Sequence, residues 1–143
     1  MAPSREEPKP GIRVLLVDDE AGYTDVLANR LRKRGLAVSK AYSGGEALRR
    51  MRGEAFDVAV VDLKMPDMDG IELLRILKMM DPALQVIMLT GHGSASACRE
   101  GMSLGAYDYL TKPCELEELL DKIRAASEKA AAPPAGGTPA GRG

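Results

Sequence analysis

The chain of 143 residues is poor in aromatic side chains: it has no tryptophan, one phenylalanine and four tyrosines. So few rings exclude a surface on which single-stranded bases stack. Positive charge is not in excess either, because 20 Lys and Arg residues stand against 21 Asp and Glu residues, for a formal net charge of -1. We therefore expect no direct binding to nucleic acid, which needs a basic surface.

Long apolar runs and paired cysteines are lacking too. No apolar run approaches the ~20 residues of a membrane-spanning helix, so we expect no membrane segment. The polar, proline-rich first residues lack the apolar core of a secretory signal. Cys98 and Cys114 stand in no metal-ligand or redox spacing, and we interpret them as free thiols in a reducing compartment. Together these features predict a cytoplasmic protein.

Short apolar runs that alternate with amphipathic stretches make up most of the chain. This alternation is typical of βαβ units and predicts an α/β fold with a parallel sheet. Hydrophobic residues make up 45% of the chain, enough for one domain with a core. The expected strands are residues 12–17, 36–41, 58–62, 85–89 and 106–110, each followed by a helix.

Local signals predict where these helices begin and end. Gly35 is expected to end the first helix, and Ser43 and Glu46 have the spacing of a capping box at the start of the second. The third is expected over residues 70–80, the fourth from a cap at Ser94 or Ser96 to Gly105, and the fifth from about Glu115.

The two ends of the chain fall outside this pattern. Residues 1–11 are expected to be a flexible lead-in, and residues 12–128 the folded domain. Residues 129–143 are rich in alanine, proline and glycine, which cannot build a core. We expect a disordered tail there or, alternatively, the start of a linker to an output domain.

Charged and hydroxyl side chains follow several of the predicted strands. Asp18 and Asp19 follow the first strand, Asp62 ends the third, Thr90 follows the fourth and Lys112 comes shortly after the fifth. Because the carboxyl ends of parallel strands meet at one edge of a sheet, these side chains should share a pocket. Three carboxylates, a hydroxyl and an ammonium group together predict a metal-assisted phosphoryl site.

Three other aspartates have simpler interpretations. Asp57 begins its strand at the opposite edge of the sheet, so we expect a turn or solvent-exposed residue. Asp67 and Asp69 lie in the loop after Asp62 and are expected to cap helices or face solvent.

Four motifs, in order and each at a strand end, resemble those of the receiver domain of two-component response regulators. They are Val17-Asp18-Asp19-Glu20, the run from Asp62 to Gly70 (DLKMPDMDG), Leu89-Thr90-Gly91 and Lys112-Pro113. The resemblance covers residues 12–128. It implies a flavodoxin-like (βα)5 fold, a doubly wound parallel sheet with strand order 2-1-3-4-5.

The resemblance implies a role for each pocket residue. Asp62 would be the phosphoacceptor, with Lys112 and the Thr90 hydroxyl binding the phosphoryl oxygens. Asp19, Asp62 and the backbone carbonyl of Lys64 would bind Mg²⁺ directly, with Mn²⁺ as an alternative, and Asp18 would hold a metal-bound water. These roles agree with the chemistry, because a divalent cation counters the repulsion between a carboxylate nucleophile and a phosphoryl group.

Further positions carry implications from the same family. Thr90 and Tyr109 would form the switch, in which the hydroxyl moves towards the phosphoryl group and the ring turns inward. Lys64 and His92 would flank the path of hydrolytic water and tune the lifetime of the phosphate. The Lys112-Pro113 peptide would be cis, and the position of Cys114 usually holds phenylalanine in the family.

The sequence thus favours a phosphoacceptor signalling module rather than an enzyme with turnover, although it would catalyse its own phosphorylation and dephosphorylation. Its phosphodonor would be a sensor histidine kinase or histidine phosphotransfer protein. A downstream protein would bind through the fourth helix, fifth strand and fifth helix. A haloacid-dehalogenase-like phosphatase is the alternative, but it needs a second aspartate two residues after the nucleophile, where Lys64 stands.

Overall fold

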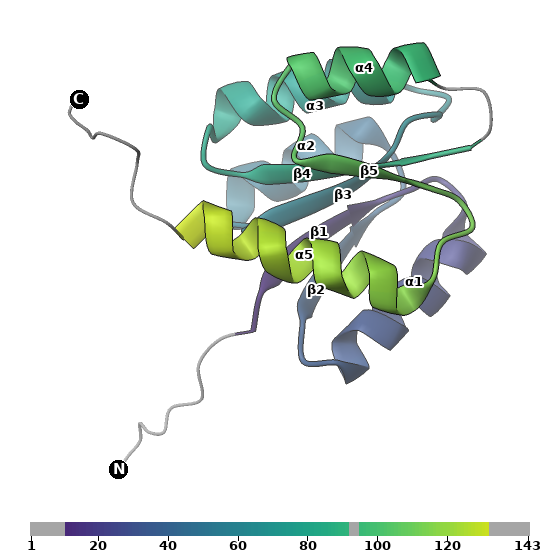
Figure 1. The fold of residues 1–143 in the computed structure, drawn as a ribbon, viewed down its shortest axis with the longest axis vertical. Coiled ribbons are helices and arrows are strands. Elements are labelled where there is room, and N and C mark those ends of the chain that lie inside the picture. The colour runs from purple at the N-terminus through teal and green to yellow at the C-terminus, as the bar shows by residue number, and fades with distance from the viewer. Residues whose placement is uncertain (1–10, 92–94, 132–143) are drawn as a thin grey trace.

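A computed structural model describes residues 11–91 and 95–131, and strands alternate with helices along them (Figure 1). The elements are β1 (Arg13–Val17), α1 (Ala21–Lys33), β2 (Ala37–Ala41), α2 (Gly44–Gly53), β3 (Val58–Asp62), α3 (Gly70–Met80), β4 (Gln85–Thr90), α4 (Ala95–Ser103), β5 (Asp108–Thr111) and α5 (Leu116–Ala131). The alternation of strand and helix is therefore as predicted.

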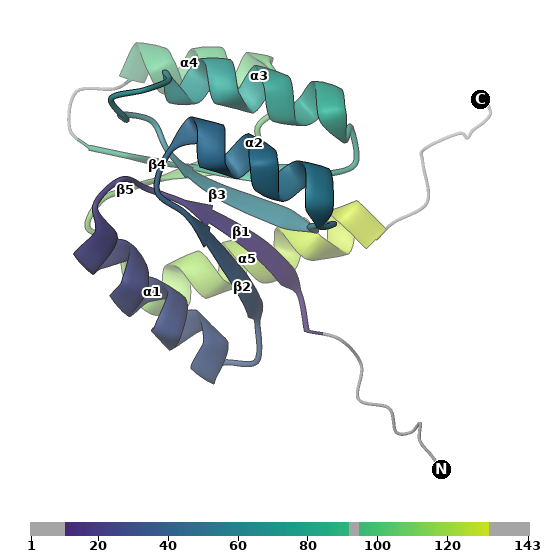
Figure 2. The same ribbon diagram turned by 180° about the vertical axis from the view of Figure 1, so that it is seen from behind.

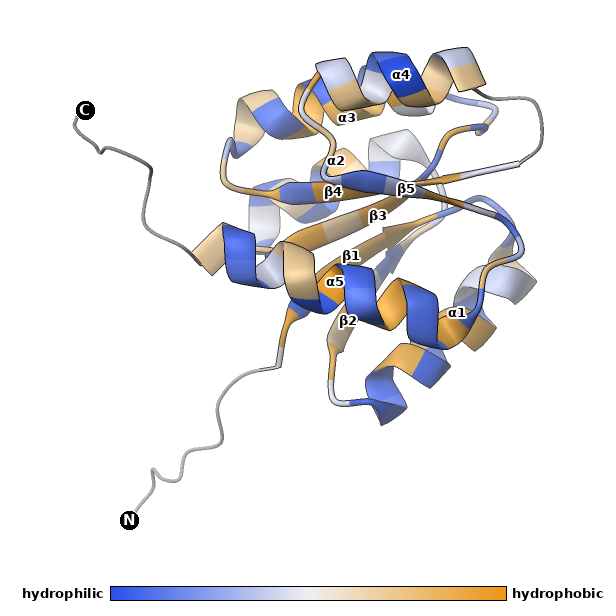
Figure 3. Ribbon diagram, viewed as in Figure 1, coloured by the Kyte–Doolittle hydropathy of each residue, from blue (hydrophilic) through white to orange (hydrophobic). Residues whose placement is uncertain are grey.

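The five strands form one parallel sheet in the order β2-β1-β3-β4-β5, which confirms the predicted fold class. Helices α1 and α5 cover one face, and α2, α3 and α4 cover the other (Figure 2). Every residue of β3 and β4 is buried, because these central strands are covered on both faces. Figure 3 shows hydrophobic colour along the central strands, whereas hydrophobic and hydrophilic residues alternate along the helices.

Several helix ends follow the predicted signals. Gly35 adopts a φ of 93° just after α1, the left-handed conformation that glycine allows at a helix end. The Ser43 side chain accepts from the Glu46 N–H at 3.1 Å, so the predicted cap forms at the start of α2. Glu46 completes the box differently from expectation, since its carboxylate accepts from the N–H of Tyr42 at 2.7 Å.

Some predicted boundaries were wrong by a few residues. Strand β5 begins at Asp108 rather than at residue 106, and α5 reaches Ala131, three residues beyond the predicted end of the folded domain. Helix α4 begins at Ala95, so Ser96 lies inside it and does not cap it. The proposed cap Ser94, and the two ends at residues 1–10 and 132–143, lie outside the described residues. Among the described helices, none has both the length and the apolar character needed to cross a membrane.

Asp57 is paired rather than simply solvated, which corrects the expectation from sequence. Its carboxylate accepts from the backbone N–H of Arg13 at 2.9 Å and from the Arg13 guanidinium at 3.0 Å. Burial works to raise the pKa of Asp57, but the hydrogen bonds from Arg13 outweigh it and hold the pKa below its ordinary value. The pair joins the amino ends of β1 and β3 at the edge opposite to the candidate site.

We expect Asp57→Asn to lower the free energy of unfolding at neutral pH, since the amide loses the charge that Arg13 binds. A lowered pKa in the folded state means that the carboxylate stabilises the fold above its ordinary pKa of 3.8, and that this contribution is lost as the pH falls further. Urea unfolding of both proteins from neutral to acid pH should show a difference that shrinks in acid. A difference that does not depend on pH, or one matched by Asp121→Asn on the exposed side of α5, contradicts this assignment.

Candidate functional site

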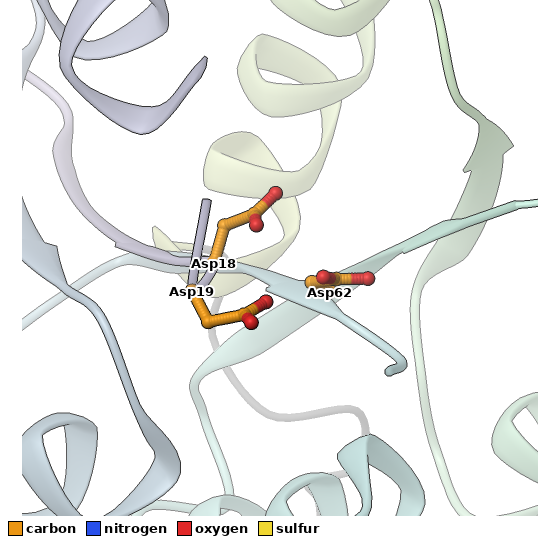
Figure 4. Close-up of side chains that lie close together, drawn as sticks. All are labelled: Asp18, Asp19 and Asp62. Atoms are coloured by element: carbon orange, nitrogen blue, oxygen red, sulfur yellow. The ribbon is translucent and has the colours of Figure 1, made fainter. Parts of the chain in front are cut away.

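Three carboxylates meet at the carboxyl edge of the sheet. Asp18 and Asp19 follow β1, and Asp62 ends the neighbouring β3 (Figure 4). Each offers a carboxylate oxygen, and these atoms all lie within 4.8 Å of one another. Asp18 and Asp62 are buried while Asp19 is exposed, so the cluster opens to solvent on one side. The prediction that these strand ends converge is confirmed as geometry.

Backbone hydrogen bonds fix Asp18 at the base of this cluster. Its N–H donates to the carbonyl of Ala41 on β2 at 3.1 Å, which extends the pairing of the sheet by one residue. Its carboxylate accepts from the N–H of Glu20 at 3.0 Å, and the Thr24 hydroxyl on α1 donates to its carbonyl at 3.0 Å. These hydrogen bonds fix the backbone and the carboxylate of Asp18, and Asp19 comes next in the chain at the same edge of the sheet.

The Lys112 ammonium group lies among the carboxylates. Its Nζ lies 2.9 Å from Asp18, 3.0 Å from Glu20 and 3.8 Å from Asp62. Partial burial works against its charge, yet the bonds to Asp18 and Glu20 outweigh this and raise the pKa of Lys112 above its ordinary value. The Lys112-Pro113 peptide is cis, as the resemblance implied.

The surroundings of Asp62 shift its pKa upward. The pKa of Asp62 is raised to about 6, chiefly by burial and in smaller part by the carboxylates of Asp18 and Asp19. The N–H of Lys64, which donates to Asp62 at 3.2 Å, and the Lys112 ammonium act in the opposite direction. Negative charge in the cluster thus remains only partly compensated, the electrostatic condition that favours a bound cation.

The donor set fits a small divalent cation. Magnesium prefers oxygen ligands and keeps several waters, so it needs only a few carboxylates and an opening to solvent. Asp18, Asp19 and Asp62 supply such oxygens at the open end of the cluster. Lys64 lies in the loop after Asp62, and its N–H donates to the Asp62 carboxylate. This hydrogen bond holds Lys64 beside the cluster, so its backbone carbonyl is a candidate for a further oxygen ligand.

The sequence that forms this site matches a known family. A model of the response regulator receiver domain family matches residues 14–124 of the chain. The chain belongs to this family. The match begins in β1 and ends in α5, so it takes in all of the strand ends that form the site.

Relatives of this receiver domain include two curated regulators. Over 115 residues it is 36% identical to the transcriptional regulatory protein ZraR of Salmonella typhimurium, covering 80% of this chain and 26% of ZraR. Over 113 residues it is 40% identical to the transcriptional regulatory protein TrcR of Mycobacterium tuberculosis, covering 79% of this chain and 44% of TrcR. The chain therefore spans less than half the length of these relatives.

Solved structures of isolated receiver domains are similar along most of their own length. One is a CheY-like receiver domain protein from Methanospirillum hungatei, with a TM-score of 0.80 and 33% identity, covering 84% of this chain and 96% of that one. Another is a receiver domain protein from Clostridium thermocellum, with a TM-score of 0.79 and 33% identity, covering 82% and 95%.

The two predicted switch residues lie on the same face of this receiver domain. Tyr109 on β5 pairs in register with Met88 on β4, and Thr90 comes two residues after Met88. Since side chains alternate between the faces of a strand, Thr90 and Tyr109 share the face that α4 covers. Thr90 is buried, with its hydroxyl donating to the Gly91 carbonyl at 3.1 Å, whereas Tyr109 is 43% exposed.

Two neighbours of Lys112 were not identified from the sequence. Glu20 binds it directly, and the ring of Tyr23 on α1 lies with its centroid 4.8 Å from the Lys112 Nζ. Glu20 directly follows the aspartate pair, so its place in that motif was an available signal, whereas nothing in the sequence near Tyr23 indicates that its ring lies beside Lys112. Both cysteines are free, as predicted, and the predicted water-flanking residue His92 lies outside the described residues.

We expect Asp19→Ala to weaken Mg²⁺ binding by at least about tenfold, because it removes an oxygen ligand at the open side of the cluster. Shifts of backbone amide resonances near Asp62 during titration with MgCl₂ give the affinity. Asp121→Ala, a carboxylate removed from the exposed side of α5, is the matched control and should bind Mg²⁺ like the unchanged protein. Equal affinity in the Asp19→Ala protein excludes this residue as a ligand.

Proposed function

We propose that this receiver domain is a phosphoacceptor whose Asp62 takes a phosphoryl group and thereby changes the conformation of the domain. One observation carries the proposal: Asp62 ends the central strand β3 with the Lys112 ammonium 3.8 Å away and two further carboxylates within 4.8 Å. A nucleophile, a cation for the phosphoryl oxygens and a set of oxygen ligands are thus within reach of one another.

The chain's own groups suit an in-line transfer. A carboxylate oxygen of Asp62 would form the new bond to phosphorus as the bond from phosphorus to the donor nitrogen breaks, and the electron pair of that bond stays on the donor. Lys112 would exchange a contact with a carboxylate for one with a phosphoryl oxygen. The hydroxyl of Thr90 donates to the carbonyl of Gly91, and a charged phosphoryl oxygen is a stronger acceptor than a carbonyl.

Asp19, Asp62 and the Lys64 carbonyl would be the direct metal ligands, and Asp18 would hold a metal-bound water. Bound there, Mg²⁺ or Mn²⁺ supplies positive charge that lowers the repulsion between the Asp62 carboxylate and the phosphoryl group. Asp18 would hold Lys112 at the same time, since its carboxylate bonds both the Glu20 N–H and the ammonium. The open side at Asp19 leaves a path for the phosphodonor and, later, for the water that removes the phosphate.

The phosphodonor would be a sensor histidine kinase or a histidine phosphotransfer protein, and the domain would catalyse its own phosphorylation and later hydrolysis. Control would pass to a downstream protein through α4, β5 and α5. Exposed apolar side chains on that surface support this assignment, with Met102 41% and Tyr109 43% exposed. The phosphatase alternative finds no support, because Lys64 stands where such an enzyme needs its acid/base carboxylate.

We predict that Asp62→Asn abolishes phosphorylation, since the amide is not a nucleophile for phosphorus. The protein is incubated with acetyl phosphate and MgCl₂, and its intact mass is measured. Asp57→Asn is the matched control, because it removes the carboxylate near the opposite end of β3 and should still gain one phosphoryl group. A magnesium-dependent gain of mass in the Asp62→Asn protein sinks the assignment.

We predict that Thr90→Ala separates phosphorylation from switching. Asp62 keeps its carboxylate and Lys112, so the variant should still accept phosphate, whereas the Tyr109 ring should lose its response. NMR of the tyrosine ring resonances, with and without beryllofluoride and Mg²⁺, measures that response. Thr111→Ala, the register neighbour on β5, serves as the control and should respond normally. A full shift of Tyr109 in the Thr90→Ala protein rules out the coupling.

A further inference from the structure

The loop that joins β3 to α3, residues 63–69, is bonded to the start of a different helix. The Oδ1 atom of Asp67 accepts from the N–H of Gly44 at 3.1 Å, and its Oδ2 atom accepts from the N–H of Gly45 at 3.0 Å. These are the first two residues of α2. One carboxylate therefore joins the loop that follows Asp62 to a helix that is remote in sequence.

Asp67 satisfies donors that α2 itself leaves free. The first N–H groups of a helix have no partner within the helix. The side chain of Ser43 accepts from the N–H of Glu46, further into the first turn. The N–H groups of Gly44 and Gly45 donate instead to Asp67. Hydrogen bonds from Gly45 and Gly44 lower the pKa of Asp67, so the carboxylate is charged where the positive end of the helix dipole favours it.

Close packing accompanies these hydrogen bonds. A Cβ atom on Gly44 would lie 2.9 Å from the Cβ of Met68 and 3.0 Å from its sulfur, closer than real side chains allow. Gly44 is buried, and Met68 packs against the hydrophobic core on that face of the sheet. The glycine thus lets the loop and the helix end lie in direct contact.

The rest of the loop is anchored at its two ends. At its start, the Lys64 N–H donates to Asp62 at 3.2 Å. At its finish, Asp69 caps α3 by accepting from the N–H of Ile71 at 3.0 Å, and the Gly70 N–H donates to the carbonyl of Leu63 at 3.1 Å. Asp67 adds a third anchor between them, on a different element. The stretch carrying the Lys64 carbonyl is therefore held from both sides.

We propose that Asp67 is a positioning residue that holds the Lys64 carbonyl ready for Mg²⁺ by fixing its loop to the start of α2. The proposal rests on the proposed function only in taking the acidic cluster as the metal site. A loop without this anchor would have to become ordered when the metal binds. The apparent affinity for Mg²⁺ would then be the affinity of the ordered loop multiplied by the fraction of time that the loop is in place. Asp67 contributes no ligand itself.

The test compares two variants that remove different hydrogen bonds from the same helix start. Asp67→Ala removes the anchor and leaves the Ser43 cap, whereas Ser43→Ala removes the cap and leaves the anchor. Both should lower the urea midpoint of unfolding, since each leaves helix donors unpaired. Only Asp67→Ala should weaken Mg²⁺ binding, by about tenfold, as outer-shell partners of metal ligands do. Asp67→Asn keeps one acceptor oxygen and should fall between Asp67→Ala and the unchanged protein.

Affinity is measured by the shift of amide resonances near Asp62 on titration with MgCl₂, with the Gly44 and Gly45 amides reporting whether the anchor is present. Equal Mg²⁺ affinity in Asp67→Ala and the unchanged protein overturns the proposal, as does an equal loss in Ser43→Ala and Asp67→Ala. If the unchanged protein and Asp19→Ala bind Mg²⁺ alike, the metal site itself is misassigned, a result that is separate from the failure of the anchor.

Discussion

Among the residues that the structure describes, the ammonium group of Lys112 is the one side-chain cation that contacts the buried carboxylates of the site, and the carboxyl edge of the sheet is arranged around it. Asp18 is fully buried, and a buried carboxylate is costly without a partner. Lys112 supplies that partner but lies 3.8 Å from Asp62, whose pKa is raised to about 6. A single lysine thus partners the buried carboxylate and leaves the negative charge of the cluster only partly compensated.

Rigid and less constrained parts of the domain are separated in space. Strands β3 and β4 are buried along their whole length and hold Asp62 and Thr90 in fixed positions. Strand β5 is a four-residue edge strand of mixed exposure, and α4 has nine residues, of which two are buried. A phosphoryl group would therefore act at a rigid centre, while the edge formed by α4 and β5 is the part that can rearrange at lower cost.

Strong local patterns in the sequence determined much of the fold. The apolar run before Asp62 predicted a strand that ends at this residue, and Gly70–Met80 was predicted with both ends correct because it has its own cap and is followed by a proline. Strand β5 was misplaced by two residues, since its start depends on which residues pair with β4 rather than on the apolar run itself. Helix α5 continues to Ala131 because the alanines that suggested a tail also favour helix.

For the site, the positions of Asp18, Asp19, Asp62, Thr90 and Lys112 near strand ends follow from the amino-acid sequence, because the alternation of strands and helices puts all carboxyl ends at one edge of the sheet. The pairing of charged side chains from different elements, by contrast, depends on how the elements pack. Glu20 meets Lys112 over 92 residues of sequence, Arg13 meets Asp57 over 44, and Gly44 meets Asp67 over 23. Such pairs depend on the distances between strand and helix ends after packing, and no local propensity or spacing encodes those distances.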